Sequence, residues 1–119
     1  MNYFPKSETQ CKCGCGMDIK DEIRNRLNIA RAECGIPICL TNGARCIEHN
    51  KEIGGAKNSD HIYGIAVDIQ PQSVKSKYKI MKAFMNAGFD RIFVYMDKDI
   101  IHAGVSGVNP GPIFQVRKT

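Results

Sequence analysis

The sequence predicts an α+β domain in which two main helices flank a small antiparallel sheet. Three observations support this prediction: two segments with apolar residues at spacings of three and four, several short β-favouring runs, and a length of 119 residues. A chain of this length can bury one modest core but not two. We find no internal repeat, low-complexity tract or linker, so residues 1–119 are expected to form a single domain.

Two amphipathic helices are expected, one within residues 17–35 and one within residues 72–88. The apolar residues at helical spacing are Ile19, Ile23, Leu27 and Ala30 in the first, and Val74, Tyr78, Met81 and Met85 in the second. Gly35 and Gly88 follow these runs, and glycine is the residue most often found just after a helix end. Before the first helix, residues 1–17 are rich in turn formers and cysteine, which predicts an irregular, Cys-rich arm.

Four short runs predict strands, at residues 36–40, 65–69, 91–96 and 100–105. Asn42 and Gly43 stop the first run, because both residue types favour turns. The last two runs are expected to form a hairpin around a tight turn at residues 97–99. Between the first two strands, residues 46–60 are polar and are expected to form a long loop.

The charge and hydropathy pattern restricts where the protein works and what it binds. Its formal net charge is +5, spread over the whole chain, which suits an anionic partner such as a bacterial wall or a nucleic acid. No run has the length of a membrane-spanning helix, and the opening MNYFPKSETQ lacks the basic-then-apolar layout of a secretory signal. We therefore expect synthesis in the cytoplasm without a signal peptide, and no membrane insertion.

Six cysteines are many for this length: Cys11, Cys13, Cys15, Cys34, Cys39 and Cys46. The even number admits disulfides, but without a signal peptide the first expectation is reduced thiols with a mainly structural role. Disulfides are the second interpretation. The run CKCGCG could also hold a metal, although its C-x-C-x-C spacing is not the C-x2-C knuckle of zinc ribbons, so a second zinc site is the third.

An acid interrupts the predicted strand at residues 65–69. A period of two places its isoleucines and valine on one face, and Ala66 and Asp68 on the other. Because Ala66 is small, the face that carries Asp68 has open space above it. Gly64 would allow a tight turn between His61 and the strand. The alternative is that Asp68 is a solvated strand residue and His61 an ordinary loop histidine.

A catalytic zinc site needs three protein ligands and one open position. His102 lies on the second strand of the predicted hairpin among apolar residues, where it is either a core histidine bonded to backbone or a ligand. His49 lies in the polar segment and is expected to be a surface or loop-packing residue. The best set of ligands is thus His61, Asp68 and His102, on the open face of the sheet, with water in the fourth position.

Hydrolysis at such a site also needs a group that takes and returns a proton. Asp99, three residues before His102, is the nearest candidate, and Asp97 is the second. In a regular strand, residues three apart face opposite sides. Asp99 therefore reaches the site only if the hairpin bends at its turn.

The segment at residues 42–69, NGARCIEHNKEIGGAKNSDHIYGIAVDI, resembles the signature of the D-alanyl-D-alanine carboxypeptidase and L-alanyl-D-glutamate endopeptidase family of zinc peptidases. This family has a hedgehog-type fold and includes phage endolysins. Its pattern S-x-H-x-x-G-x-A-x-D is met by Ser59, His61, Gly64, Ala66 and Asp68. Its upstream arginine, H-N and G-G elements are met by Arg45, His49, Asn50, Gly54 and Gly55. The similarity covers about residues 36–105, and SETQCKCGCG resembles the amino-terminal arm of small phage members.

The resemblance implies a role for each matching residue. His61, Asp68 and His102 would bind one zinc ion, Asp99 would be the general base, and Arg45 and Ser59 would contact the substrate, with Arg45 also stabilising its oxyanion. Two positions depart from the family pattern. Many relatives have H-x-D at the last histidine, where this chain has His102-Ala103-Gly104, and many have serine where this chain has Cys46.

By this resemblance the expected reaction is hydrolysis of a peptide bond next to a D-amino acid in peptidoglycan stem peptides. Whether the enzyme is a D-Ala-D-Ala carboxypeptidase or an L-Ala-D-Glu endopeptidase stays open. We expect a monomer of phage or prophage origin that reaches the bacterial wall after release, with the help of a holin or an equivalent.

Two other classes of function are considered. The first is a catalytically inactive, zinc-stabilised wall-binding module. The second is a nucleic-acid-binding protein, which is disfavoured because tryptophan is absent and only 8% of residues are aromatic.

Overall fold

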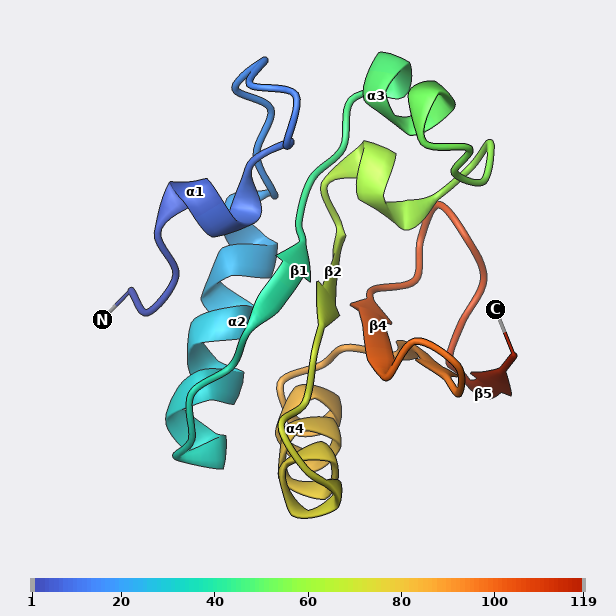
Figure 1. Cartoon of the computed structure of the whole chain (residues 1–119). Helices are drawn as coiled ribbons and strands as arrows, with labels where there is room; N and C mark the ends of the chain where they lie inside the picture. Colours follow the sequence, from blue (N-terminus) through green and yellow to red (C-terminus); the bar gives the residue numbers. More distant parts are fainter. Residues whose placement is uncertain (1, 119) are drawn as a thin grey trace.

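The computed structural model describes residues 2–118 and confirms the α+β class (Figure 1). The strands are β1 (Leu40–Asn42), β2 (Ala66–Ile69), β3 (Arg91–Tyr95), β4 (Ile100–Gly104) and β5 (Ile113–Arg117). The helices are α1 (Lys6–Thr9), α2 (Asp21–Cys34), α3 (Ile47–Glu52), the 3-10 helix η1 (Asp60–Tyr63) and α4 (Val74–Asn86). Among the helices of residues 2–118, none has the length and hydropathy of a transmembrane span.

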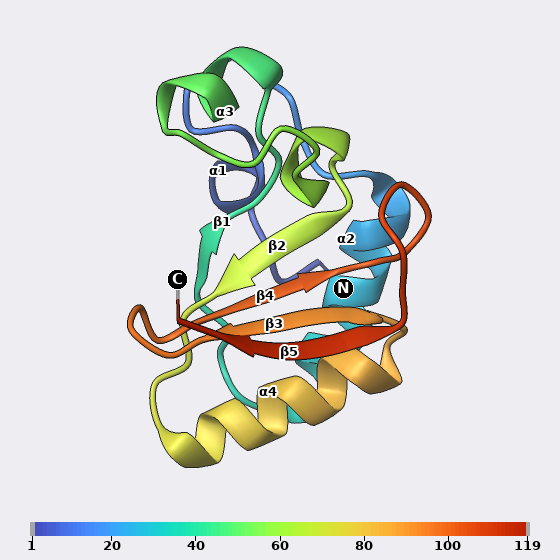
Figure 2. The ribbon, with the colours of Figure 1, turned by 90° about the vertical axis from the view of Figure 1, so that its right-hand side faces the viewer.

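The five strands form one open sheet in the order β1-β2-β4-β3-β5. The β1–β2, β2–β4 and β3–β4 pairs are antiparallel, as expected, and the predicted hairpin of β3 and β4 is confirmed. The edge strand β5 runs parallel to β3 (Figure 2) and was not predicted. Its sequence follows a run of turn-forming residues, and every residue in it is exposed, so it lacks the alternation that identifies a half-buried strand.

The two faces of the sheet differ because side chains alternate along each strand. The core face is formed by Val67 and Ile69 of β2 and by Ile101 and Ala103 of β4, and helices α2 and α4 pack against it. Helix α2 lies behind the sheet in Figure 2. The opposite face carries Ala66 and Asp68 of β2, as the sequence predicts, and no helix covers it.

Both main helices form where the apolar spacing predicts them. In α2 the buried residues are Ile23, Leu27 and Ala30, and Gly35 ends the helix in the left-handed conformation at φ 68°. In α4 the residues predicted to form the apolar face do not form the buried face, because Val74 and Tyr78 are exposed. The residues that α4 buries are Ile80, Ala83 and Phe84.

The first strand lies later in the chain than predicted. The run at residues 36–40 favours β structure by composition, but pairing occurs only from Leu40 to Asn42. The partner strand β2 ends at Ile69, which lies opposite Leu40, so earlier residues have no strand to pair with. Pro37 also lacks the N–H group that a ladder requires.

Two segments predicted as irregular contain short helices. The arm at residues 1–17 includes the single turn α1, and the predicted loop at residues 46–60 contains α3 and leads into η1. Neither α1 nor α3 has the apolar repeat that reveals a helix in sequence. Cys46 caps the start of helix α3, and its Sγ accepts a hydrogen bond from the N–H of His49.

Candidate metal centre

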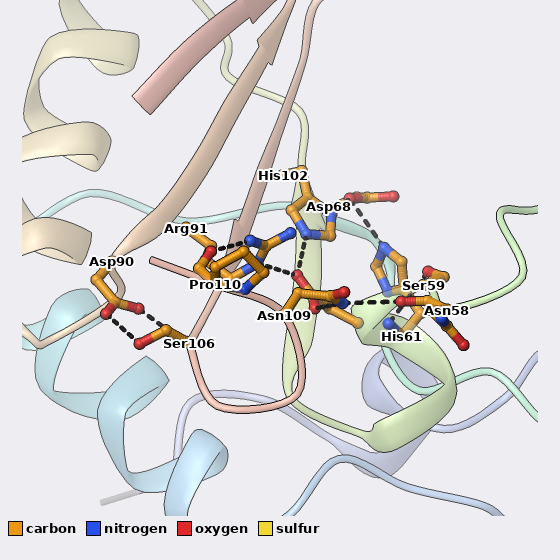
Figure 3. Close-up of polar contacts among 11 residues, drawn as sticks. Asn58, Ser59, His61, Asp68, Asp90, Arg91, His102, Ser106, Asn109 and Pro110 are labelled. Carbon is orange, nitrogen blue, oxygen red and sulfur yellow. Dashed lines mark hydrogen bonds and ion pairs between the residues drawn. The ribbon is translucent and has the colours of Figure 1, made fainter. Parts of the chain in front are cut away.

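Three side chains converge on the open face of the sheet, as Figure 3 shows. Asp68 Oδ1 lies 3.1 Å from His61 Nε2 and 3.1 Å from His102 Nδ1. One ligand atom from each residue lies within 4.8 Å of the others. All three side chains are largely buried, with exposed fractions of 4%, 14% and 10% for His61, Asp68 and His102. The structure thus brings together the set predicted from sequence.

Local structure explains why these residues meet. The register of β2 and β4 places Asp68 directly opposite His102, so both side chains project from the same face. His61 comes from η1, where the Ser59 hydroxyl accepts a hydrogen bond from the His61 N–H at 3.2 Å. Gly64 ends η1 in the left-handed conformation, at φ 68°, and turns the chain into β2.

The outer nitrogen of each histidine has a partner that fixes which nitrogen faces the metal. His61 Nδ1 lies 2.7 Å from the backbone oxygen of Gly43, which can only accept, so Nδ1 carries the proton and Nε2 is free to bind. His102 Nε2 lies 3.2 Å from Asp60 Oδ2, which leaves His102 Nδ1 free. Two neutral imidazole nitrogens and a carboxylate are the donors that zinc prefers, so these residues fit that ion.

Asp60, which no sequence pattern singled out, is the centre of a second polar group. This residue is 3% exposed, and its carboxylate accepts from Arg91 Nε at 2.9 Å and from Asn109 Nδ2 at 2.8 Å, besides contacting His102. Burial alone would raise the pKa of Asp60, but these hydrogen bonds outweigh it and hold the pKa well below its usual range. An ionised carboxylate behind a histidine ligand orients the ring and raises its basicity.

Asp60 places a carboxylate beside Gly104, one of the two positions where the chain departs from the sequence pattern described above. A Cβ atom added at Gly104 would lie 3.0 Å from Asp60 Oδ2, so the Asp60 carboxylate occupies the space beside residue 104. Relatives with H-x-D have a carboxylate at the position of Gly104. In this chain the carboxylate beside His102 comes from η1 instead of β4.

The charged groups of the site shift one another's pKa values. Burial opposes ionisation of Asp68, but hydrogen bonds to His102 and His61 outweigh it and lower the pKa of Asp68. Burial likewise disfavours the charged form of His102, but Asp60 and Asp68 raise its pKa above the ordinary 6.5. Without metal, His102 is therefore protonated at pH values where a free histidine is already neutral.

Zinc affinity is expected to rise with pH. A histidine ligand must lose its proton to bind metal, and the raised pKa of His102 extends the competition with protons above the ordinary histidine pKa of 6.5. Chelator competition between about pH 6 and about pH 8 should show progressively tighter binding. Calorimetry in two buffers that differ in ionisation enthalpy should show net proton release at the lower pH. A pH-independent affinity over this range would contradict the prediction.

Asp99, the predicted general base, is not brought to this site. It lies in the β3–β4 turn, is 60% exposed, and forms an ion pair with Lys77 of α4 at 3.1 Å. Its side chain therefore lies toward α4 and away from His102. Asp97 does not line the cavity above the metal centre either. In this structure the hairpin does not bend toward the site, so Asp99 is not placed beside the metal ligands, and its role as general base stays a prediction that the variant below tests.

The variant Asp99→Asn is expected to retain nearly full activity. A general base contributes a factor of about 10²–10⁴, whereas we expect kcat/KM to change by less than about threefold. Steady-state hydrolysis at saturating zinc measures this. A loss of about 100-fold or more, with unchanged zinc affinity, would restore Asp99 as the base.

Arg45 is buried beside the metal centre, and the residues after it hold it in place. Its backbone N–H donates to the His61 oxygen at 3.0 Å, and its Nη1 donates to Asn50 Oδ1 at 2.7 Å. Asn50 in turn donates to the oxygen of Ala56 at 2.9 Å. A Cβ atom at Gly55 would lie 2.1 Å from Asn50 Oδ1, so a larger residue there would displace the Asn50 side chain from Arg45. Asn50 of the H-N element and Gly55 of the G-G element thus hold the Arg45 side chain in place.

A cavity of about 730 Å³ lies over the metal centre. Its wall includes four cationic side chains, from Arg45, Arg91, Lys98 and Arg117. Among the described residues that line it, Asp60 and Asp68 provide the only carboxylates, and both are engaged by histidines. Ser59 also lines the cavity, although its hydroxyl already caps η1. The cavity therefore presents positive charge around a site that can hold one metal ion.

Comparison with known proteins is consistent with this geometry. A family model described as Peptidase M15 matches residues 2–104, which is most of the chain. A search of curated proteins finds no match.

Proposed function

Because the chain belongs to the Peptidase M15 family, whose members are zinc-dependent peptidases, we propose that it hydrolyses a peptide bond next to a D-amino acid in peptidoglycan stem peptides. The observation that carries this proposal is the convergence of His61, Asp68 and His102 at the floor of a cation-lined cavity. Two bonds are candidates, the D-Ala-D-Ala bond of a carboxypeptidase and the L-Ala-D-Glu bond of an endopeptidase.

The three ligands would hold zinc and leave one side of the ion open to the cavity. When bound, zinc polarises a carbonyl group and makes a water molecule acidic near neutral pH. Gly43 and Asp60 keep the two imidazole rings in the orientation that binding requires. Asp60 and Asp68 are the carboxylates among the described lining residues, and both are engaged by histidines, so neither is free to serve as the general base.

The cationic wall of the cavity supports a substrate with carboxylate groups. Stem peptides carry free carboxylates close to both candidate bonds. Arg45 is buried near the metal and belongs to the same cavity wall, and its planar guanidinium can bind a carboxylate in a forked geometry. It could equally donate to the oxyanion that develops during hydrolysis. Ser59 and Lys98 would line the path of the peptide.

Mass analysis of digested peptidoglycan tests the proposal and identifies the bond. Purified sacculi are incubated with the zinc-loaded wild type and with His61→Ala as the control. We expect fragments from the wild type only. Loss of one terminal alanine identifies a carboxypeptidase, and a new amino terminus on D-Glu identifies an endopeptidase. If the wild type holds zinc and sediments with sacculi but releases no fragment, the protein is a wall-binding module and the proposal is wrong.

The setting of the activity is part of the same proposal. We propose that the protein is a monomer of phage or prophage origin that reaches the wall after release through a holin or an equivalent. Its net charge of +5 supports attraction to an anionic wall. Nucleic acid is not the proposed partner, since the cations described above surround a metal centre and a peptide-sized cavity.

A further inference from the structure

Four cysteines far apart in the sequence come together outside the peptidase site. Cys11, Cys13 and Cys15 belong to the amino-terminal arm, and Cys46 immediately precedes α3. Their four Sγ atoms all lie within 4.8 Å of one another. Cys11 Sγ lies 3.4 Å from Cys13 Sγ, which lies 3.6 Å from Cys46 Sγ. None of the four lines the cavity over the metal centre.

These separations match the edges of a tetrahedral zinc–thiolate site. With a Zn–S distance of about 2.3 Å, ideal tetrahedral geometry places sulfur atoms about 3.8 Å apart. An iron–sulfur cluster distributes its thiolates over several iron atoms, which requires wider spacing than this group has. All six cysteines, Cys34 and Cys39 included, have free thiols. The four sulfurs are therefore arranged for a single ion.

The backbone around the group supports this arrangement. Gly14 and Gly16 have φ values of 85° and 90°, which let the arm curl so that alternating cysteines face a common centre. The N–H of Cys46 donates to Cys11 Sγ, and the N–H of His49 donates to Cys46 Sγ, both at 3.3 Å. Hydrogen bonds of this kind stabilise metal-bound thiolates.

We propose that Cys11, Cys13, Cys15 and Cys46 bind a second zinc ion in a closed, structural site. Cys11 and Cys15 have the C-x3-C spacing that occurs among structural zinc ligands, with Cys13 added between them. The site supplies four protein ligands and no open position, so its role is structural and not catalytic. The structure thereby favours the interpretation that the sequence alone placed third.

The second ion would brace the loop that orients His61. The arm already contacts this loop, because the N–H of Ala44 donates to the Thr9 oxygen at 2.8 Å. Gly43 packs so closely that an added Cβ atom would lie 2.2 Å from the same oxygen. The Gly43 oxygen in turn accepts from His61 Nδ1. A zinc ion bound by the arm and by Cys46 would therefore hold the arm against the segment at residues 43–46. This segment includes Gly43, whose oxygen orients the His61 ring.

Counting zinc in matched variants tests the proposal. The full chain is purified under reducing conditions, and metal is quantified by mass spectrometry. We expect about two zinc ions per chain in the wild type, one in the double variant Cys13→Ser/Cys15→Ser, and one in His61→Ala. The matched control Cys34→Ser/Cys39→Ser removes two cysteines outside the group and should keep both ions. Both serine replacements in the test variant fall on exposed residues, so they remove little packing.

Cobalt spectroscopy distinguishes the two sites, and its readouts from the wild type and from His61→Ala do not depend on a cysteine variant. Co²⁺ in the thiolate site should give an intense sulfur-to-metal charge-transfer band, which His61→Ala retains and Cys13→Ser/Cys15→Ser loses. The proposal is wrong if the wild type holds one zinc that only His61→Ala removes, if no charge-transfer band appears, or if the group holds iron. Because His61→Ala reports on the peptidase site alone, failure of either proposal is distinguishable from failure of the other.

Discussion

Replacing Asp60 by alanine is expected to lower the free energy of unfolding by about 3–5 kcal/mol, the range for breaking a buried ion pair. The variant would leave Arg91 Nε and Asn109 Nδ2 without their carboxylate partner, and both contacts are shorter than 3 Å. It would also free the outer nitrogen of His102. Loss of such a partner typically lowers metal affinity 10–100-fold, so zinc binding should weaken by about that factor. Urea unfolding at saturating zinc and chelator competition measure the two effects.

Asp18→Ala is the matched control for this prediction. Asp18 pairs with Arg24 at 3.0 Å, but both side chains are more accessible, and neither contacts the metal centre. Its loss should therefore destabilise the fold by about 1 kcal/mol or less and leave zinc affinity unchanged. Equal effects of the two substitutions on zinc affinity would mean that Asp60 does not orient His102.

Asp68→Asn should abolish hydrolysis and weaken zinc binding by more than about 100-fold, which is beyond the effect of losing an outer partner. The substitution keeps the shape of the side chain but removes the negative charge between His61 and His102. A neutral amide is a much poorer zinc ligand than a carboxylate, and the positive charge of the ion would lose its counter-charge. Chelator competition and the peptidoglycan digest give the two readouts.

Asp99→Asn makes the same chemical change outside the cavity and serves as the control for Asp68→Asn. It should bind zinc as the wild type does. If Asp68→Asn also retained zinc and released fragments at the wild-type rate, Asp68 would be removed from the ligand set. The remaining pair of histidines could not by itself form a three-ligand site.

His61 and Asp68 could be predicted from sequence because the signals that place them are short-range, whereas His102, 34 residues from Asp68, could be proposed because the chain has only three histidines. Alternation along β2 places Asp68 on the open face, and the few residues from His61 to Gly64 form one turn before that strand. The network around Asp60 could not be predicted in this way. Its partners Arg91, His102 and Asn109 are 31, 42 and 49 residues away, and only the assembled sheet brings them together.

The same distinction applies to the rest of the fold. Helix α2 and the β3–β4 hairpin follow from local periodicity and turn chemistry, and both occur where expected. Strand β5 depends on a parallel partner that lies before it in the sequence, with β4 between them, so no local pattern reveals it. The catalytic prediction for Asp99 depended on a bend at the hairpin turn, and local spacing alone could not decide it.

The metal ligands also make one register of β2 against β4 more favourable than the others, because two of the ligands lie on these strands. The apolar residues of the two strands favour any register that keeps their core face inward, whereas zinc binding requires Asp68 opposite His102. A slip of one residue would move one of these side chains to the helix-covered face, and a slip of two would separate them along the strands. Zinc therefore stabilises one register among the alternatives, by an amount that grows with its free concentration. For this chain, zinc bound at this site would then favour correct strand pairing as well as supply the chemistry of hydrolysis.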